Sequence, residues 1–211
     1  AGRIQRRYGN RSMAVLRENP YRLASDVAGI GFKRADEIAR SFGIPEDSPL
    51  RARAGLLHAL SQDADDGHTR SERHDLIGRA ARELSIEAAR LEIACDDLLG
   101  SGHLAADGTA LALSALDDAE RACAADLARL AAGEAPSAVV PAELRTAERS
   151  CRIQLEATQR HAVERMATAP LAILTGGPGT GKTTCLRVLL SVMAARGERV
   201  LMAAPTGRAA R

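Results

Sequence analysis

A glycine-rich loop between an apolar stretch and a helix-forming stretch constrains this chain more than any other feature. The loop, residues 176–183, reads GGPGTGKT and matches the pattern GxxxxGKT. Residues 171–175 (LAILT) predict a short strand before it, and residues 183–195 predict a helix after it, ended by Gly197. In this context of strand, glycine loop and helix, the pattern predicts a phosphate-binding loop at the start of an α/β domain.

The residue types of the loop indicate what each would hold. Its backbone amides are expected to surround a β-phosphate, Lys182 to bridge the β- and γ-phosphates, and the Thr183 hydroxyl to bind Mg²⁺. On the preceding predicted helix, the amide of Gln159 can pair with an adenine edge as donor and acceptor. ATP and Mg²⁺ are therefore the predicted cofactors, and Lys182 is the predicted catalytic residue. The predicted ATP-binding residues are Gln159, Gly177, Pro178, Gly179, Thr180, Gly181, Lys182, Thr183 and Thr184.

A second predicted strand and a polar segment follow the loop. Residues 199–204 (RVLMAA) predict the strand, and PTGRAA comes directly after it. Open α/β sheets bind ligands beyond the carboxyl ends of their strands. Pro205, Thr206, Gly207 and Arg208 therefore bring a hydroxyl, glycine amides and a positive charge to an expected ligand site.

A double-glycine turn near the beginning of the chain predicts a second phosphate site. Residues 19–43 indicate two short helices on either side of Gly29-Ile30-Gly31. We expect glycine at both positions because the turn requires backbone angles closed to other residues and must admit a ligand to its amides. Lys33 would add a charge beside the same phosphate. A purely structural turn is the alternative.

The turn resembles the helix-hairpin-helix motif of DNA-binding proteins, in which the hairpin has the pattern hxGhGxxxAxxI, here residues 27–38. Such motifs grip the nucleic-acid backbone without reading its sequence. The resemblance makes Gly29, Gly31 and Lys33 the predicted DNA-binding residues of this region.

Charge is distributed unevenly along the chain. Residues 1–40 carry a net charge of +5, residues 41–150 a net charge of −9, and residues 151–211 a net charge of +6. Two basic ends around an acidic middle predict polyanion contacts at the ends, with solvent-facing helices as the alternative. Of 29 lysines and arginines only Lys33 and Lys182 are lysine, and both fall at predicted phosphate sites, where a compact charge on a flexible stem fits.

The middle of the chain predicts a small helical module. Residues 50–60, 75–84 and 86–99 have helical periodicity, and Asp107-Gly108 between apolar residues predicts a two-stranded hairpin. This is the outline of a winged helix. Its many acidic residues favour a scaffold over a role in reading a DNA groove.

Cysteine spacing and hydropathy indicate the cellular setting. The four cysteines lie far apart without metal-ligand spacing, which predicts neither a disulfide framework nor a zinc site. No apolar run approaches about 18 residues and no signal peptide opens the chain. We expect a cytoplasmic protein with no membrane contact.

Together, GGPGTGKTT, the preceding glutamine, APTGRAA and NPYRLASDVAGIGFKRADEIA resemble the long, stand-alone RecD-like superfamily-one DNA helicases, relatives of the exonuclease V alpha subunit. The resemblance implies ATP-driven 5′ to 3′ translocation and unwinding in DNA repair or recombination. It assigns ATP and magnesium to Lys182 and Thr183, adenine to Gln159, and the backbone of single-stranded DNA to residues 205–208. The chain departs from the family at Glu156, where serine, threonine or asparagine is usual.

The resemblance also implies the fold. We expect a mainly α N-terminal region, with a helix-hairpin-helix and a winged-helix-like module, followed by the start of an α/β RecA-like phosphate-loop domain. An internal repeat at 1–9 and 35–43, and a pattern that should continue past Arg211, lead us to expect a chain cut at both ends. The predicted boundaries are 1–48 for the hairpin region, 49–135 for the module, 136–150 for a linker and 151–211 for the incomplete ATPase lobe.

Two other classes of protein remain open on these residues. One is a non-enzymatic DNA-binding adaptor, and the other is a different phosphate-loop ATPase, such as a recombinase or an AAA-class loader, fused to a hairpin motif. Single-stranded or forked DNA is the expected partner, together with unspecified single-stranded-DNA-binding or repair proteins. The 211 residues contain no acidic pair on a later strand and no arginine finger, so we expect them to hydrolyse ATP poorly on their own.

Overall fold

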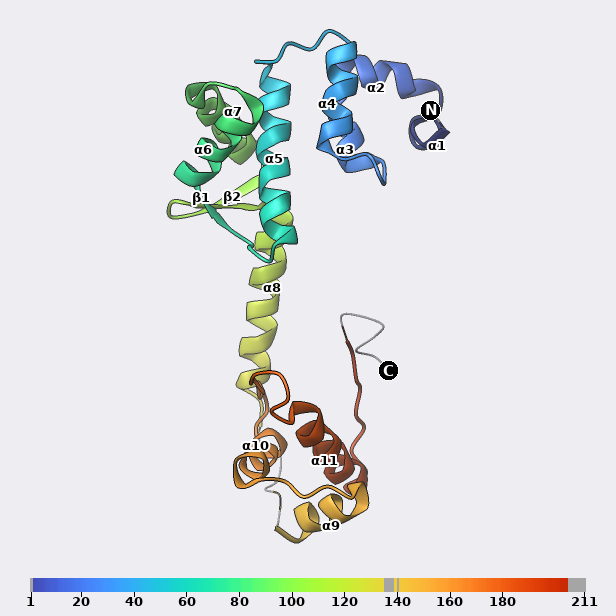
Figure 1. The fold of residues 1–211 in the computed structure, drawn as a ribbon, viewed down its shortest axis with the longest axis vertical. Helices are drawn as coiled ribbons and strands as arrows, with labels where there is room; N and C mark the ends of the chain where they lie inside the picture. Colours follow the sequence, from blue (N-terminus) through green and yellow to red (C-terminus); the bar gives the residue numbers. More distant parts are fainter. Residues whose placement is uncertain (1, 135–138, 140, 205–211) are drawn as a thin grey trace. The chain divides into compact units, whose positions relative to one another are not determined.

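The protein is described here by a computed structural model, which describes residues 2–134, 139 and 141–204. The chain forms two compact units, Ala1–Ala122 and Cys123–Arg211 (Figure 1). The first unit contains α1 (Gly2–Tyr8), the 3₁₀ helix η1 (Gly9–Arg11), α2 (Ser12–Glu18), α3 (Arg22–Asp26), α4 (Phe32–Ser41), α5 (Pro49–Asp65), β1 (Ser71–Glu72), α6 (Arg73–Leu84), α7 (Ala88–Gly100), β2 (Leu104–Asp107) and β3 (Ala110–Leu113). Helix α8 (Ser114–Ala131) begins in the first unit and ends in the second, which also contains α9 (Pro141–Cys151), α10 (Ala157–Thr168) and α11 (Lys182–Ala195).

The predicted glycine turn joins α3 to α4. Gly29 has a φ of +80°, in the left-handed region where glycine is favoured. Gly31, in contrast, caps α4 with φ −87° and ψ 177°, an extended conformation open to any residue, and a Cβ built on it meets nothing within 4 Å. The expectation that backbone angles require glycine twice is therefore correct at Gly29 and wrong at Gly31.

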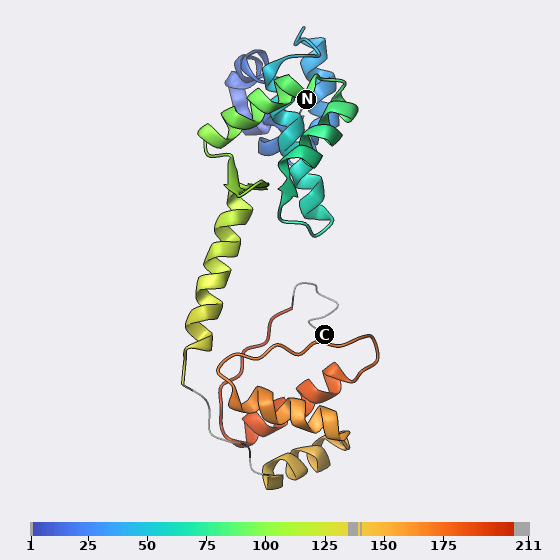
Figure 2. The same cartoon turned by 90° about the vertical axis from the view of Figure 1, so that its left-hand side faces the viewer.

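The predicted winged-helix-like module is present in residues 49–113. Its elements follow the order α5, β1, α6, α7, β2, β3, and the antiparallel sheet has the order β1-β3-β2. The predicted hairpin pairs Asp107 with Ala110 around Gly108, whose φ is +60°. Strand β1 pairs Ser71 with Leu111, a contact that the sequence did not predict. Figure 2 shows the hairpin leading through β3 directly into α8.

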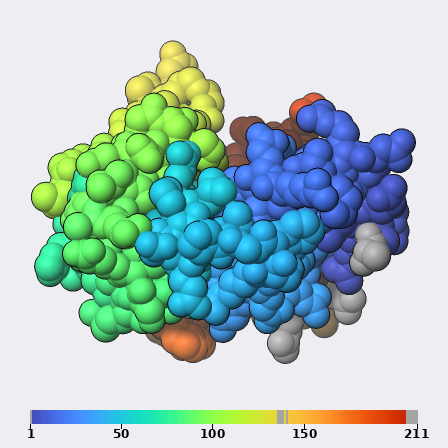
Figure 3. Space-filling model, turned by 90° about the horizontal axis from the view of Figure 1, so that it is seen from above, coloured from blue at the N-terminus to red at the C-terminus, as the bar shows by residue number. Residues whose placement is uncertain are grey.

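The hairpin region and the module share one core. Apolar side chains from α2 to α7 and from the sheet form a single buried cluster, and in Figure 3 residues of the hairpin region (blue) lie against those of the module (cyan and green). A ring stack crosses the junction: Phe32 lies 6.0 Å from Tyr21 and 5.0 Å from His58, centroid to centroid. Tyr21 is the N-cap of α3, Phe32 begins α4 and His58 lies on α5. The ring stack therefore packs the helices on both sides of the glycine turn against the core of the module.

A buried ion pair reinforces this junction. Arg51 of α5 donates to both carboxylate oxygens of Asp36 in α4, at 2.9 and 3.2 Å, and also to the backbone oxygens of Glu46 and Leu84. The hydroxyl of Tyr21 donates to the same carboxylate at 2.7 Å. Burial raises the pKa of Asp36, but the hydrogen bonds from Arg51 and Tyr21 outweigh it and leave the pKa below its ordinary value.

Helices α9, α10 and α11 pack together in the second unit. Leu144, Val163, Val188 and Val192 are almost completely buried between them. The predicted helix at 183–195 is confirmed as α11. In the described part of this unit, α9, α10 and α11 therefore share one small core, and the glycine loop lies directly before α11.

The two strands predicted beside α11 are wrong for the residues that the structure describes. Residues 171–175 and 199–204 have no strand assignment and pair with no described segment. A strand forms only when a neighbouring strand satisfies its backbone donors and acceptors. Neither segment has such a neighbour within the described ranges, and Ile173, Leu201 and Met202 are correspondingly 79%, 86% and 75% exposed.

Replacing Arg51 by Met is expected to destabilise the first unit by about 3–5 kcal/mol, because the buried Asp36 carboxylate would lose its counter-ion. Both tyrosines of the chain lie in this unit and the chain has no tryptophan, so tyrosine fluorescence during urea unfolding reports on it alone. Arg53→Met is the matched control on the same helix, where the guanidinium donates to Ser101 in an exposed position.

Urea unfolding followed by tyrosine fluorescence at several pH values tests whether the charge of Asp36 is the cause of the destabilisation. Since the folded pKa of Asp36 is depressed, its contribution is complete above the unfolded pKa of about 4 and is lost as the pH falls below it. This acid-dependent loss should shrink in Arg51→Met. Equal costs for the two arginine substitutions would show that the ion pair does not hold the junction.

Candidate nucleotide and nucleic-acid sites

The glycine loop curls around its lysine. Gly179 and Gly181 have φ values of +75° and +82°, which only glycine adopts without strain. The Nζ of Lys182, the first residue of α11, donates to the carbonyl oxygens of Gly176 and Gly177 at 2.5 and 2.6 Å. The hydroxyl of Thr180 also donates to Gly177, at 2.9 Å. The ammonium group of Lys182 thus lies within the glycine loop, at the N-terminus of α11.

Gln159 connects this loop to the start of α10. Its side-chain nitrogen donates to the carbonyl oxygen of Thr180 at 3.2 Å, and its side-chain oxygen accepts from the backbone N–H of Glu156 at 3.1 Å. Glu156 and Gln159 form a reciprocal capping box. The residue that departs from the family pattern therefore still serves as an N-cap.

Close packing makes one glycine of the loop part of this connection. A Cβ on Gly181 would collide with the side-chain nitrogen of Gln159. Gly179 has the same left-handed backbone but open space around the position of a Cβ. The contact between α10 and the loop therefore depends on the absence of a side chain at Gly181. The sulfur of Cys185 adds a second link by donating to the backbone oxygen of Gln159 at 3.9 Å.

The glycine turn of the first unit is bordered by arginines from α1. A guanidinium nitrogen of Arg3 donates to the carbonyl oxygen of Ala28 at 3.1 Å and lies so close to Gly29 that a Cβ there would collide with it. Arg6 and Arg34 line a hollow of about 390 Å³ beside Ile30. Lys33 is exposed on the first turn of α4, next to the turn. Three arginines therefore border the turn, and Lys33 adds a further exposed charge at the start of α4.

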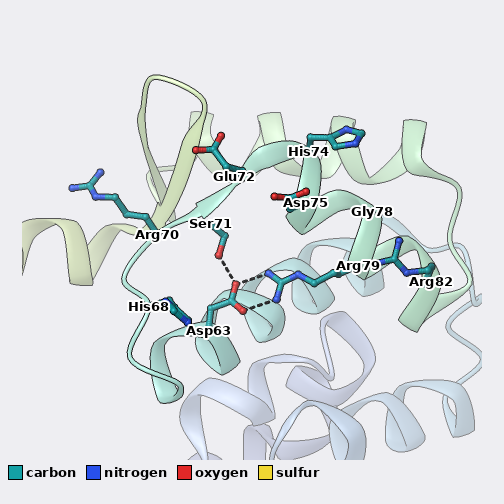
Figure 4. A pocket seen from close by; sticks show the side chains of 10 residues that line it. All are labelled: Asp63, His68, Arg70, Ser71, Glu72, His74, Asp75, Gly78, Arg79 and Arg82. Atoms are coloured by element: carbon teal, nitrogen blue, oxygen red, sulfur yellow. Dashed lines mark hydrogen bonds and ion pairs between the residues drawn. The ribbon is translucent and has the colours of Figure 1, made fainter.

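A larger hollow in the module is electrically neutralised. It has a volume of about 510 Å³, and Figure 4 shows Asp63, Ser71 and Arg79 pointing toward one another within it. Arg79 donates to both oxygens of Asp63, and Arg70 forms ion pairs with Asp117 and with two other carboxylates. Because Arg70 and Arg79 already have carboxylate partners, this network is structural and these two groups offer little to an anion. Of the three lining arginines, Arg82 alone has no ion pair with a described carboxylate.

Four predicted ligand contacts lie outside the described residues. They are Pro205, Thr206, Gly207 and Arg208. Within the described part, the structure brings Gln159 together with the loop that contains Lys182, 23 positions away, and keeps Gly29, Gly31 and Lys33 together at the hairpin.

Sequence comparisons match both sites to known families. The family described as "ATP-dependent RecD2 DNA helicase HHH domain" matches residues 1–70, and the family described as "AAA domain" matches residues 154–211. The ATP-dependent RecD2 DNA helicase of Deinococcus radiodurans is 28% identical over 225 aligned positions, which cover 100% of this chain and 31% of that protein. The chain is thus similar to a RecD2 helicase over its whole length.

Two shorter matches are also to proteins named RecD. The RecBCD enzyme subunit RecD of Mycobacterium tuberculosis is 46% identical over 59 residues, or 25% of this chain and 10% of that protein. The corresponding subunit of Mycolicibacterium smegmatis is 44% identical over 59 residues. The chain thus matches a helix-hairpin-helix domain family near its beginning and an AAA domain family near its end, and it spans about a third of the length of the Deinococcus relative.

Two contributors to these sites were not predicted from the sequence. Arg3 reaches the glycine turn from 25 positions away, and no local pattern indicates that contact. Glu156 caps α10 together with Gln159, three residues later. This spacing is that of a capping box, with glutamate in place of the usual serine or threonine, and it can be read from the sequence.

Gly181→Ala is expected to destabilise α11 more than Gly179→Ala. Both substitutions place alanine in a left-handed conformation, which costs about 1–2 kcal/mol, but only Gly181→Ala also drives a methyl group into Gln159. Hydrogen exchange of α11 peptides, measured by mass spectrometry, gives the local opening free energy. Adding Gln159→Ala should bring the cost of Gly181→Ala down to that of Gly179→Ala, and a cost unchanged by this second substitution would refute the contact.

Proposed function

We propose that the protein to which this chain belongs is an ATP-dependent 5′ to 3′ DNA helicase or translocase that acts in DNA repair or recombination. The observation that carries the proposal is the pairing of a lysine-centred phosphate loop with a glycine-turn hairpin in one chain whose full length aligns with a RecD2 helicase. The described helices include none long and apolar enough to cross a membrane. We propose a cytoplasmic location, with single-stranded or forked DNA as the ligand.

The loop residues fit a nucleoside triphosphate. The positive φ of Gly179 and Gly181 leaves their amides bare, and α11 contributes the positive end of its dipole. Lys182 already lies inside the loop, where it would exchange the carbonyls of Gly176 and Gly177 for phosphate oxygens. Thr183, exposed on the first turn of α11, would hold Mg²⁺. The metal would neutralise phosphate charge when bound.

Gln159 has the second role in this proposal. Its amide would recognise adenine as donor and acceptor, and the same amide now contacts Thr180 and Glu156. Adenine binding would therefore compete for hydrogen bonds that hold the loop against α10. The remaining ATP-binding residues, Gly177, Pro178, Thr180 and Thr184, would line the phosphate path, and Pro205, Thr206, Gly207 and Arg208 would contact the DNA backbone.

The rival classes explain fewer of these features. A recombinase or AAA-class loader would account for the AAA-type match over residues 154–211 but not for the RecD2 hairpin match over residues 1–70. A DNA-binding adaptor would account for the hairpin, but it requires no lysine held in a glycine loop beside a glutamine. The helicase proposal accounts for both the hairpin match and the AAA-type match.

Lys182→Ala is expected to weaken binding of a fluorescent ATP analogue at least tenfold in the presence of Mg²⁺, because one charge-assisted hydrogen bond is worth about 1.5–3 kcal/mol. Lys182→Arg should not restore binding, since a planar guanidinium does not fit the space of a compact ammonium inside the loop. Lys33→Ala is the matched control and should bind the analogue normally. We further propose that the 211-residue chain alone has little ATPase activity, and a robust rate abolished by Lys182→Ala would contradict this.

Gly31→Val combined with Lys33→Ala is expected to weaken binding of single-stranded or forked oligonucleotides about tenfold at low salt. The slope of log K against log salt should fall by about 0.7 on single strands for each phosphate that the variant no longer neutralises. The double variant should fold normally because Gly31 is extended and its Cβ position is open. Lys182→Ala serves as the control and should bind DNA normally without nucleotide. An unchanged affinity would remove the hairpin from the proposal.

A further inference from the structure

Two arginines of α9 and the arginine that follows its last residue line a groove in the second unit that belongs to neither proposed site. The groove has a volume of about 490 Å³, and Arg145, Arg149 and Arg152 border it together with Ile153, Gln154 and Arg160. All three α9-side arginines are exposed. The opposite edge of the groove is the segment that leads from α9 into α10.

The base of the groove contains one carboxylate, and it is already satisfied. Glu148 is buried and accepts from Arg160 at 2.9 Å and from the backbone N–H of Leu155 at 2.9 Å. Burial raises the pKa of Glu148, but these two hydrogen bonds and the charges of Arg160 and Arg145 outweigh it and leave the pKa below its ordinary value. Glu148 thus neutralises Arg160 and leaves the charges at the rim in excess.

The rim arginines have no such compensation. Within the part of the chain that the structure describes, no carboxylate forms an ion pair with Arg145, Arg149 or Arg152, although sixteen other ion pairs are present there. One guanidinium nitrogen of Arg149 donates to the Thr146 hydroxyl, which carries no charge. This contrasts with Arg70 and Arg79 in the neutralised hollow of Figure 4.

The spacing of the three arginines favours an extended anion over a single one. They occupy positions i, i+4 and i+7 of the sequence, which places them on one side of α9, and Arg152 directly follows the helix end with a φ of +55°. Four helical residues rise about 6 Å, so Arg145 and Arg149 form a row along α9 that Arg152 extends past the helix end. The groove lining contains no aromatic ring on which a base could stack.

We propose that this groove, formed by Arg145, Arg149 and Arg152, is a further binding site for the phosphate backbone of a nucleic acid, independent of base sequence and separate from both the hairpin and the phosphate loop. Its chemistry is that of guanidinium groups, whose planar forks bind phosphate oxygens in pairs. The site rests on the proposed DNA-dependent function and deepens it, because it adds a DNA contact to the one proposed for residues 205–208 of the same chain.

The test uses the full 211-residue chain and a fluorescein-labelled single-stranded oligonucleotide at a series of salt concentrations. Replacing Arg145, Arg149 and Arg152 together by Gln should weaken binding about tenfold and lower the salt slope by roughly 2, since each phosphate contact on a single strand contributes about 0.7. The matched control replaces Arg129, Arg165 and Arg187 by Gln, which removes the same charge from three exposed positions outside the groove. The control should change affinity less than threefold.

Two further arms separate the outcomes. Combined with Gly31→Val and Lys33→Ala, the groove variant should lose affinity multiplicatively, as independent sites do. If the hairpin variant weakens DNA binding while the groove variant behaves like its charge control, the groove inference fails and the proposed function stands. If the groove variant instead loses affinity for the fluorescent ATP analogue and keeps its affinity for DNA, the groove is part of the nucleotide site and the inference is overturned.

Discussion

The buried ion pair between Asp36 and Arg51 is the interaction on which the first unit depends. It joins α4, which carries the glycine turn, to α5, the first helix of the module, and the Tyr21 hydroxyl and the Leu84 carbonyl complete its hydrogen bonds. A charge buried in this way is costly unless every partner is present. The pair therefore ties the orientation of the turn to the integrity of the module core, where Phe32 stacks between Tyr21 and His58.

A smaller network has the same function in the second unit. Gln159 satisfies the first turn of α10 through Glu156 and holds the phosphate loop through Thr180, and the bare Gly181 allows the close approach. A residue expected to contact adenine is thus already a structural element of the loop. Substitutions at Gln159 will affect both the packing of α10 and any nucleotide contact, which is why the comparison of Gly179 with Gly181 isolates the packing contribution.

Pairing of arginines with carboxylates distinguishes structural surfaces from candidate binding surfaces in this chain. Arg70, Arg73 and Arg79 of the module are each matched by at least one acidic partner. The arginines beside the glycine turn and those along α9 are not matched in this way in the described residues, with Arg3 bound to a backbone carbonyl and Arg149 to a hydroxyl. An uncompensated cluster of guanidinium groups attracts polyanions, whereas a compensated one stabilises packing.

The sequence by itself determined the local features. The GxxxxGKT loop before a helix, the left-handed glycine at position 29 and the Asp107-Gly108 hairpin all depend on neighbouring residues, because backbone angles are set over a few positions. Only the tertiary structure decided which residues meet across the chain. Arg3 reaches the glycine turn, Ser71 pairs with Leu111 to add β1 to the sheet, and Arg51 neutralises Asp36 because packing brings distant segments together. The predicted strands at 171–175 and 199–204 failed for the same reason: a short apolar run favours a strand, but a strand forms only where another backbone lies beside it.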